Sequence, residues 1–95
     1  MVSKEVNVVN PSGLHLRPAG YLSQTALRFK SDITIEYQGK KVIVKSVLNV
    51  MAAGIRAGEK IRVVCDGLDE DEALRAVCEA IKSGLGEDVS GKQSS

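Results

Sequence analysis

Aromatic residues are scarce in this 95-residue chain, which has no tryptophan, two tyrosines and one phenylalanine. Tyr21, Phe29 and Tyr37 alone offer little surface on which nucleic-acid bases can stack. An excess of one charge is lacking too, because 13 Lys and Arg stand against 12 Asp and Glu, for a net charge of +1. Both shortages argue against a protein that binds nucleic acid by stacking or by bulk electrostatics.

The chain also lacks long apolar runs and a signal-peptide pattern at its N-terminus. No stretch approaches the length that crosses a bilayer, so we expect a cytoplasmic protein without membrane insertion. Cys65 and Cys78 are the only cysteines, and each lies inside an apolar pattern with no histidine nearby. That context predicts buried thiols of a reducing compartment and makes a poor metal site, so we expect no metal and no cofactor.

What is present suits one small domain, with 43% apolar and 26% charged residues. Alternation of apolar with polar residues predicts strands over residues 6–9, 33–38, 42–44 and 61–65. The middle two strands are expected to form a hairpin around Gly39. Apolar steps of three and four predict helices between them. The predicted order is strand, helix, strand, strand, helix, strand, helix.

Two of these helices have one clear apolar face. The first begins close behind residue 15, with Pro18 in its first turn, and its expected buried face is Ala19, Leu22, Ala26 and Phe29. The last begins with four acidic residues, 69–72, whose charges suit a helix N-terminus without any metal, and its expected buried face is Leu74, Val77 and Ile81. Residues 88–95 have no apolar period, so we expect a domain over residues 1–87 and a disordered tail.

The helix predicted over residues 46–54 has almost no polar face. Ser46 suits its N-cap and Gly54 lies near its C-terminal end. In so small a domain we expect Val50 and Ala53 to face the core. We expect three apolar residues to stay outside as a docking patch, an interpretation we prefer to plain core: Val47, Leu48 and Met51.

His15 is the only histidine, and it directly precedes the first predicted helix. A neutral imidazole is a nucleophile near neutral pH, helix-start N–H groups attract anions, and Arg17 adds positive charge. A lone histidine is often only a surface side chain. The flanking Gly13, Arg17 and Pro18 favour an acceptor and donor of a phosphoryl group instead.

Two motifs resemble one family. The run from Gly13 to Ala19 (GLHLRPA), followed at the family's separation by Lys45-Ser46, resembles HPr, the histidine phosphocarrier of the bacterial sugar phosphotransferase system. The resemblance covers about residues 3–87 without a gap. It includes further residues, namely Glu36-Tyr37, Gly39-Lys40, Val50-Met51, Gly54-Ile55, Gly58 and Gly67.

The resemblance implies an α+β fold, an open-faced β-sandwich in which a four-stranded antiparallel sheet carries three helices on one face (βαββαβα). The order of elements by itself also permits a ferredoxin-like arrangement. The resemblance therefore decides a topology that periodicity leaves open.

The resemblance also implies a relay. Enzyme I, phosphorylated by phosphoenolpyruvate, passes its phosphoryl group to Nδ1 of His15, and His15 passes it to sugar-specific acceptor domains of transporters. Arg17 compensates charge and, with Leu16, binds the phosphate. With the docking patch we group three residues of the first helix: Gly20, Gln24 and Leu27. We expect an exposed site on a monomer that turns over no substrate alone.

For Ser46 the simplest interpretation is an N-cap worth about 1 kcal/mol. The resemblance implies in addition a regulatory phosphorylation by HPr kinase/phosphorylase, an enzyme chiefly of Gram-positive lineages. New charge beside Val47, Leu48 and Met51 would repel an acidic partner. The phosphorylated form would instead fit a basic pocket on a catabolite-control repressor.

Departures and alternatives accompany this hypothesis. Leu16, Gly20 and Asn49 differ from the residues usual in the family and bear on partner choice or transfer rate. One alternative is a purely regulatory corepressor controlled through Ser46, although relatives specialised in that way lack the histidine. A second, an acylphosphatase-like hydrolase, needs a phosphate-loop arginine with a water-positioning asparagine, and no such pair surrounds Arg17.

Overall fold

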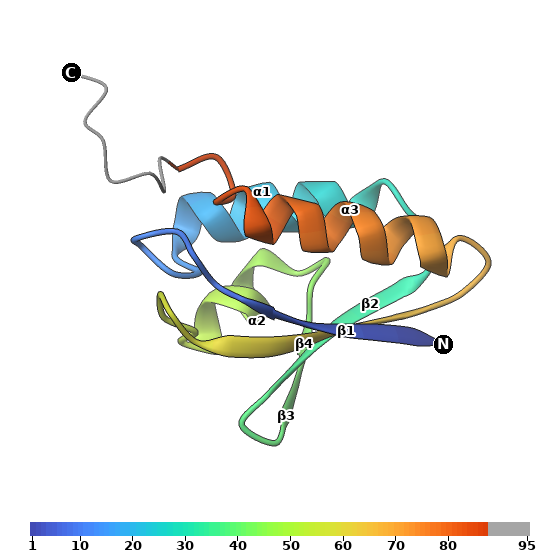
Figure 1. Ribbon diagram of the computed structural model, residues 1–95, viewed down its shortest axis with the longest axis horizontal. Helices are drawn as coiled ribbons and strands as arrows, with labels where there is room; N and C mark the ends of the chain where they lie inside the picture. The colour runs from blue at the N-terminus through green and yellow to red at the C-terminus, as the bar shows by residue number, and fades with distance from the viewer. Residues whose placement is uncertain (88–95) are drawn as a thin grey trace.

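Three α-helices cover one face of a four-stranded antiparallel sheet (Figure 1). The computed structural model describes residues 1–87. The elements are β1 (Val2–Asn7), α1 (Leu16–Leu27), β2 (Asp32–Tyr37), β3 (Lys40–Ile43), α2 (Val47–Ala52), β4 (Lys60–Asp66) and α3 (Glu70–Lys82). The expected open-faced α+β sandwich is confirmed. The tail expected over residues 88–95 lies outside the described residues.

The strands lie in the order β1-β4-β2-β3, and every neighbouring pair is antiparallel. Cys65 of β4 pairs with Val2 of β1 on one side and with Ile33 of β2 on the other. The ferredoxin-like alternative is excluded by the strand order, because that arrangement places the third strand between the first two, whereas β4 lies between β1 and β2 here. β1, at the edge of the sheet, pairs with β4, which is far from it in sequence. The N-terminal strand therefore lies beside the strand that precedes the last helix.

The core lies between the sheet and the helices. Alternate residues of β2 and β4 point into it, because successive side chains of a strand face opposite sides of the sheet. The largest fully buried apolar residues come from every layer: Leu22, Ile35, Ile61, Ile81, Val8, Val44, Val50, Val63 and Val77. Two details of the expected pattern differ. β1 ends at Asn7 and not at residue 9, and Phe29 lies past the end of α1 and is only partly buried.

Two side-chain bonds hold α1 beside the segment that leads into α2. The buried Ser23 Oγ donates to the carbonyl of Val44 (2.7 Å), and Lys45 Nζ donates to the carbonyl of Phe29 (2.7 Å). Each bond satisfies a backbone carbonyl just past the end of an element, that of Val44 after β3 and that of Phe29 after α1. The start of α2 is therefore fixed relative to α1, which matters for the surface the two helices share.

Cys65 and Cys78 are buried free thiols, as expected. Burial raises the pKa of the Cys65 thiol to about 11, and burial also raises that of Cys78. Both therefore stay protonated and unreactive near neutral pH. Within residues 1–87 no helix is long and apolar enough to cross a membrane, and no cluster of His, Cys, Asp and Glu side chains could hold a metal ion.

Candidate functional site

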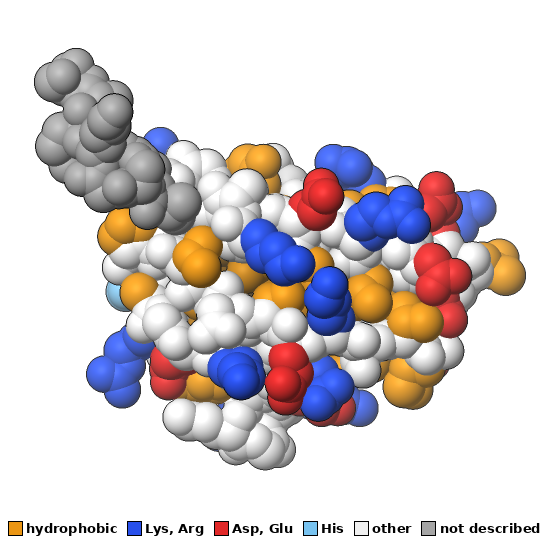
Figure 2. All heavy atoms as spheres, in the orientation of Figure 1, with side chains coloured by type: hydrophobic (Ala, Val, Ile, Leu, Met, Phe, Trp, Pro, Cys, Tyr) orange, Lys and Arg blue, Asp and Glu red, His pale blue; other side chains and the backbone are white. Residues whose placement is uncertain are grey.

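His15 is the N-cap residue of α1, with extended backbone angles (φ −80°, ψ −170°). Its side chain is exposed and makes no cap hydrogen bond to the helix. Figure 2 shows the imidazole at the molecular surface, where a partner protein can reach it. The expected exposed position at a helix start is confirmed.

The first turn of α1 presents a small set of backbone donors next to this imidazole. Pro18 has no N–H, and the N–H of Ala19 donates to the carbonyl of His15 (2.7 Å). The N–H groups of Leu16 and Arg17 precede the first intrahelical bond and have no helical carbonyl to accept from them. A helix end of this kind attracts an anion through its free donors and its dipole.

The turn before His15 is packed against a second loop, residues 54–58. The N–H of Leu14 donates to the carbonyl of Ile55 (3.0 Å). Gly13 has φ +66°, and a Cβ there would lie 2.7 Å from the oxygen of Ile55. Only glycine fits both the backbone conformation and this close approach. The glycine two residues before the histidine thus sets how closely the two loops meet.

The loop over residues 54–58 is itself held by a carboxylate. Glu59 Oε1 accepts from the hydroxyl of Tyr37 (2.6 Å) and from the N–H of Arg56 (2.8 Å). Both bonds favour the charged form, with that from Tyr37 the larger, and they lower the pKa of Glu59. The end of β2 is in this way connected to the support behind Gly13.

Arg17 is exposed in the first turn of α1 and forms no salt bridge within residues 1–87. It shares a shallow depression with Tyr21 and Glu87. The pKa of Glu87 is lowered mainly by hydrogen bonds from Asn10 and Ser12 and also by the positive charge of Arg17. The arginine thus adds positive potential at the helix end that carries His15.

A family model described as the phosphotransferase-system HPr component phosphorylation site matches residues 2–83. The chain belongs to the HPr family. Membership gives it a phosphocarrier role in the phosphotransferase system. The matched region contains both His15 and Ser46.

Solved structures agree with the family model. An HPr of Thermoanaerobacter tengcongensis is 38% identical, with a TM-score of 0.88 over 93% of this chain and 99% of that chain. The phosphocarrier protein HPr of Bacillus anthracis is 40% identical, with a TM-score of 0.81 over 84% and 95%. Crh, the catabolite repression HPr of Bacillus subtilis, is 36% identical, with a TM-score of 0.63 over 84% and 95%.

Ser46, the second residue singled out from the HPr resemblance, is the N-cap of α2. Its Oγ accepts from the N–H of Asn49 (3.2 Å), and its carbonyl accepts from the N–H of Val50 (3.1 Å). The side chain is half-buried. Asn49 also contributes an acceptor, because its Oδ1 takes a bond from the N–H of Ile43 (3.4 Å).

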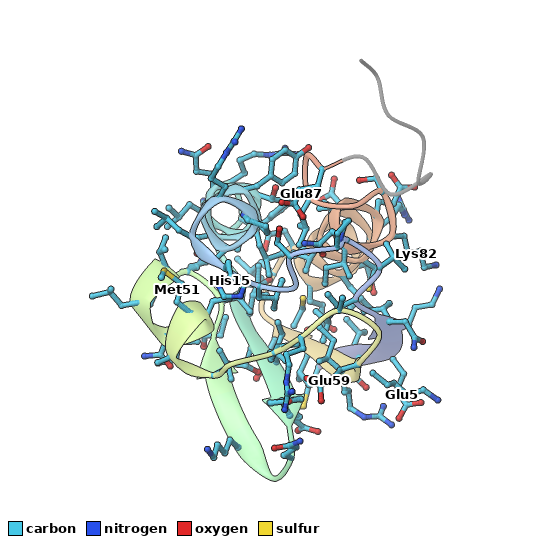
Figure 3. All side chains as sticks on the ribbon, turned by 90° about the vertical axis from the view of Figure 1, so that its left-hand side faces the viewer. Glu5, His15, Met51, Glu59, Lys82 and Glu87 are labelled. Carbon is cyan, nitrogen blue, oxygen red and sulfur yellow. The ribbon has the colours of Figure 1, made fainter. Side chains whose placement is uncertain are left out.

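The expected docking residues lie on two helices that contact each other, α1 and α2. Leu48 is 78% exposed, Met51 36% and Leu27 61%, and Gln24 is exposed, whereas Gly20 is half-buried. Val47 differs from the expectation, since it is half-buried and packs against the core. Figure 3 looks onto the end of the molecule where α1 begins, and His15 and Met51 both lie there.

Leu16 belongs with this surface, because it is 62% exposed beside His15. Leu16, Gly20, Gln24 and Leu27 recur at steps of three and four, so they line one face of α1. We call the exposed residues of this surface the α1–α2 patch: Leu16, Gln24, Leu27, Leu48 and Met51. The bulk of Leu16 therefore adds to an apolar surface and does not close the site.

Asn10, Glu59 and Glu87 are site residues that the sequence did not reveal. An asparagine before a proline signals a turn and nothing more, while Glu87 stands at the end of the domain with no local pattern around it. Their roles come from contacts between distant segments, such as Asn10 with Glu87. Periodicity and spacing along the chain report nothing about such contacts.

Proposed function

We propose that this HPr-family protein carries a phosphoryl group on His15 from phosphorylated Enzyme I to sugar-specific acceptor domains of transporters. One observation supports this above all others. The only histidine of the chain is an exposed N-cap whose helix presents the N–H groups of Leu16 and Arg17.

The chemistry follows from this geometry. The neutral Nδ1 attacks the phosphorus of phospho-Enzyme I, the bond from phosphorus to the donor side chain breaks, and a phosphoramidate forms on His15. The N–H groups of Leu16 and Arg17, with the Arg17 guanidinium, stabilise the added charge. Protonation of the imidazole makes it a good leaving group, so the group passes on to the next acceptor.

An exposed acceptor requires a surface that partners recognise. The α1–α2 patch supplies apolar area next to His15, and Arg17 supplies positive charge at its border. Because each partner must approach the same histidine, we expect them to use this patch in turn. A monomer in the cytoplasm is part of the proposal, although relatives of known structure include a dimeric HPr of Thermoanaerobacter tengcongensis.

A second candidate activity is regulation through phosphorylation of Ser46 by HPr kinase/phosphorylase, with a catabolite-control repressor as the partner of the product. The position of Ser46 next to Leu48 and Met51 supports it, because a phosphate there changes the charge of the docking surface. The likeness to Crh supports a regulatory role as well. The presence of His15 favours the relay over a purely regulatory corepressor.

The test is transfer of labelled phosphate from phosphoenolpyruvate through cognate Enzyme I. We expect an acid-labile, base-stable phosphoprotein, and no label on the His15→Ala variant. Ser46→Ala is the matched control and should label normally, because it removes the other candidate acceptor. Labelling of folded His15→Ala under these conditions would show that another residue is the acceptor. ATP-dependent labelling at Ser46 without labelling at His15 would favour the corepressor.

A further inference from the structure

The turn that leads into His15 is closed by a single buried asparagine. Within residues 10–13, the N–H of Gly13 donates to the carbonyl of Asn10 (3.1 Å). The side-chain Nδ2 of Asn10 donates back to the carbonyl of Gly13 (2.7 Å). Both backbone polar groups of Gly13 are thus bonded to one residue, and His15 follows two positions later.

Glu87 contacts the same turn, although it lies 77 positions after Asn10 in the sequence. Its Oε1 accepts from Asn10 Nδ2 (3.0 Å) and from the N–H of Ser12 (3.2 Å), and its Oε2 accepts from Ser12 Oγ (2.7 Å). Figure 3 shows Glu87 where the end of the domain meets the N-terminal side of α1. One carboxylate therefore accepts hydrogen bonds from three donors of this turn, two of them from Ser12 and one from Asn10.

The orientation of the Asn10 amide is dictated by its neighbours. Asn10 is 0% exposed, and both of its contacts, a carbonyl and a carboxylate, can only accept. Its Nδ2 must therefore point at them, and its Oδ1 is left as a buried atom without a hydrogen-bond partner within residues 1–87. Leaving a buried acceptor unpaired is unfavourable, so an asparagine here needs a compensating role.

From these contacts, and on the basis of the proposed function, we infer that Asn10 and Glu87 are positioning residues for phosphoryl transfer at His15. We call the hydrogen bonds that join Asn10, Ser12 and Glu87 the carboxylate–amide clasp. The clasp fixes the turn from the solvent side, while the loop over residues 54–58 fixes Gly13 and Leu14 from the other side. His15 and the N–H groups of Leu16 and Arg17 are thereby held in one relative geometry.

The kinetic consequence concerns the chemical step more than docking. The clasp lies outside the α1–α2 patch, so its loss leaves partner recognition in place. A small displacement of the acceptor atom from its line of attack lowers the rate of transfer steeply. Loss of the clasp is therefore expected to lower the maximal rate of phosphorylation by Enzyme I, with little change in the concentration giving half-maximal rate.

The experiment measures phosphorylation of the full chain by phospho-Enzyme I under single-turnover conditions. We expect Glu87→Ala and Asn10→Ala each to lower the maximal transfer rate by about tenfold to a hundredfold. The double variant should be no slower than the slower single variant, because both changes break the same clasp. Glu79→Ala, which removes an exposed carboxylate of α3 outside the clasp, is the matched control and should transfer at the wild-type rate.

Glu87→Gln separates positioning from charge. Glutamine keeps one acceptor oxygen for Asn10 Nδ2 and the N–H of Ser12, and its amide N–H can donate to Ser12 Oγ, so the clasp can form without the negative charge. Positioning therefore predicts near wild-type transfer. A Gln variant as slow as Glu87→Ala would overturn the clasp in favour of an electrostatic effect. Faster exchange of the Gly13 N–H in Glu87→Ala, followed by NMR, is the accompanying structural signature.

Two further outcomes would overturn the inference. One is wild-type transfer by Glu87→Ala and Asn10→Ala, and the other is a double variant in which the two losses multiply. Neither touches the proposed function, which fails only if wild-type protein is not labelled or if His15→Ala is. Because Glu87 is only half-buried, its variants test the clasp even if Asn10→Ala folds poorly.

Discussion

The carboxylate of Asp69 joins the start of α3 to the segment that leads into β2. Its Oδ1 accepts from the N–H of Ser31 (2.9 Å) and from Ser31 Oγ, and its Oδ2 accepts from the N–H of Lys30 (2.9 Å). These bonds, the one from Ser31 Oγ first, lower the pKa of Asp69 to about 2. Although Asp69 is the N-cap residue of α3, its side chain makes no cap bond and serves a tertiary contact instead.

This lowered pKa makes a prediction about acid stability. The pKa of an aspartate in the unfolded chain is about 3.9. Between about pH 4 and pH 2 this carboxylate is therefore protonated in the unfolded state while Asp69 of the folded state is still charged. The free energy of unfolding should therefore fall as the pH drops through this window. Asp69→Asn should be less stable than wild type at pH 7, with the difference narrowing towards pH 2.

Urea unfolding of both proteins at pH 7, 4 and 2 measures that difference. Asp71→Asn is the matched control, because Asp71 is exposed in the same helical turn and takes no part in the contact. A difference between wild type and Asp69→Asn that stays constant over this pH range would show that the carboxylate is not the group responsible.

At the scale of elements, α2 is the helix whose proposed function depends on its N-cap residue, Ser46. Ser46→Ala removes the acceptor for the N–H of Asn49 and should lower the free energy of unfolding by about 1 kcal/mol. Ser46→Asp keeps an N-cap acceptor, so its stability should stay near wild type. The added charge should nevertheless slow phosphorylation of His15 by Enzyme I, because it lies beside the docking surface.

The two variants are therefore expected to change different quantities. Chemical denaturation should rank Ser46→Ala below Ser46→Asp, whereas transfer from Enzyme I should rank them in the opposite order. If Ser46→Asp were strongly destabilised, the cap position would have no room for charge. If it accepted phosphate at the wild-type rate, regulation through docking would be excluded.

The elements themselves were largely predictable, and the exceptions have a common cause. The apolar steps of α1 and α3 and the hairpin around Gly39 come from local spacing, which backbone geometry enforces directly. Val47 was expected outside but packs against the core, and Phe29 was expected inside but is only partly buried. Val47 is the first residue of α2 and Phe29 lies just past the end of α1, and exposure at such positions depends on the neighbouring element and not on the helical period.

At the scale of the whole molecule, one end of the domain combines an acceptor, positive charge and apolar surface. His15, Arg17 and the α1–α2 patch meet where α1 begins, and the open face of the sheet lies on the other side of the core. A charge introduced into the patch should weaken docking without unfolding the protein. We therefore expect Leu48→Glu and Met51→Glu to weaken binding to Enzyme I by about tenfold, which is about 1.4 kcal/mol.

Leu68→Glu is the matched control for these variants. Leu68 is 97% exposed in the turn between β4 and α3, outside the patch, so the same new charge there should leave binding unchanged. Titration of Enzyme I followed by calorimetry gives the affinities, and thermal unfolding checks the fold. Equal weakening by all three variants would point to net charge, and unfolding of Met51→Glu would make Met51 a core residue.

The sequence by itself determined the strands and helices, the exposed histidine at a helix start and, through two motifs, the HPr family. These depend on spacing of a few residues, so they can be read along the chain. Only the tertiary structure decided the contacts of Asp69 with Ser31, of Glu59 with Tyr37 and of Glu87 with Asn10. Such partners are brought together by the order of the strands and the packing of the helices, and no local pattern encodes which distant donor a carboxylate will meet.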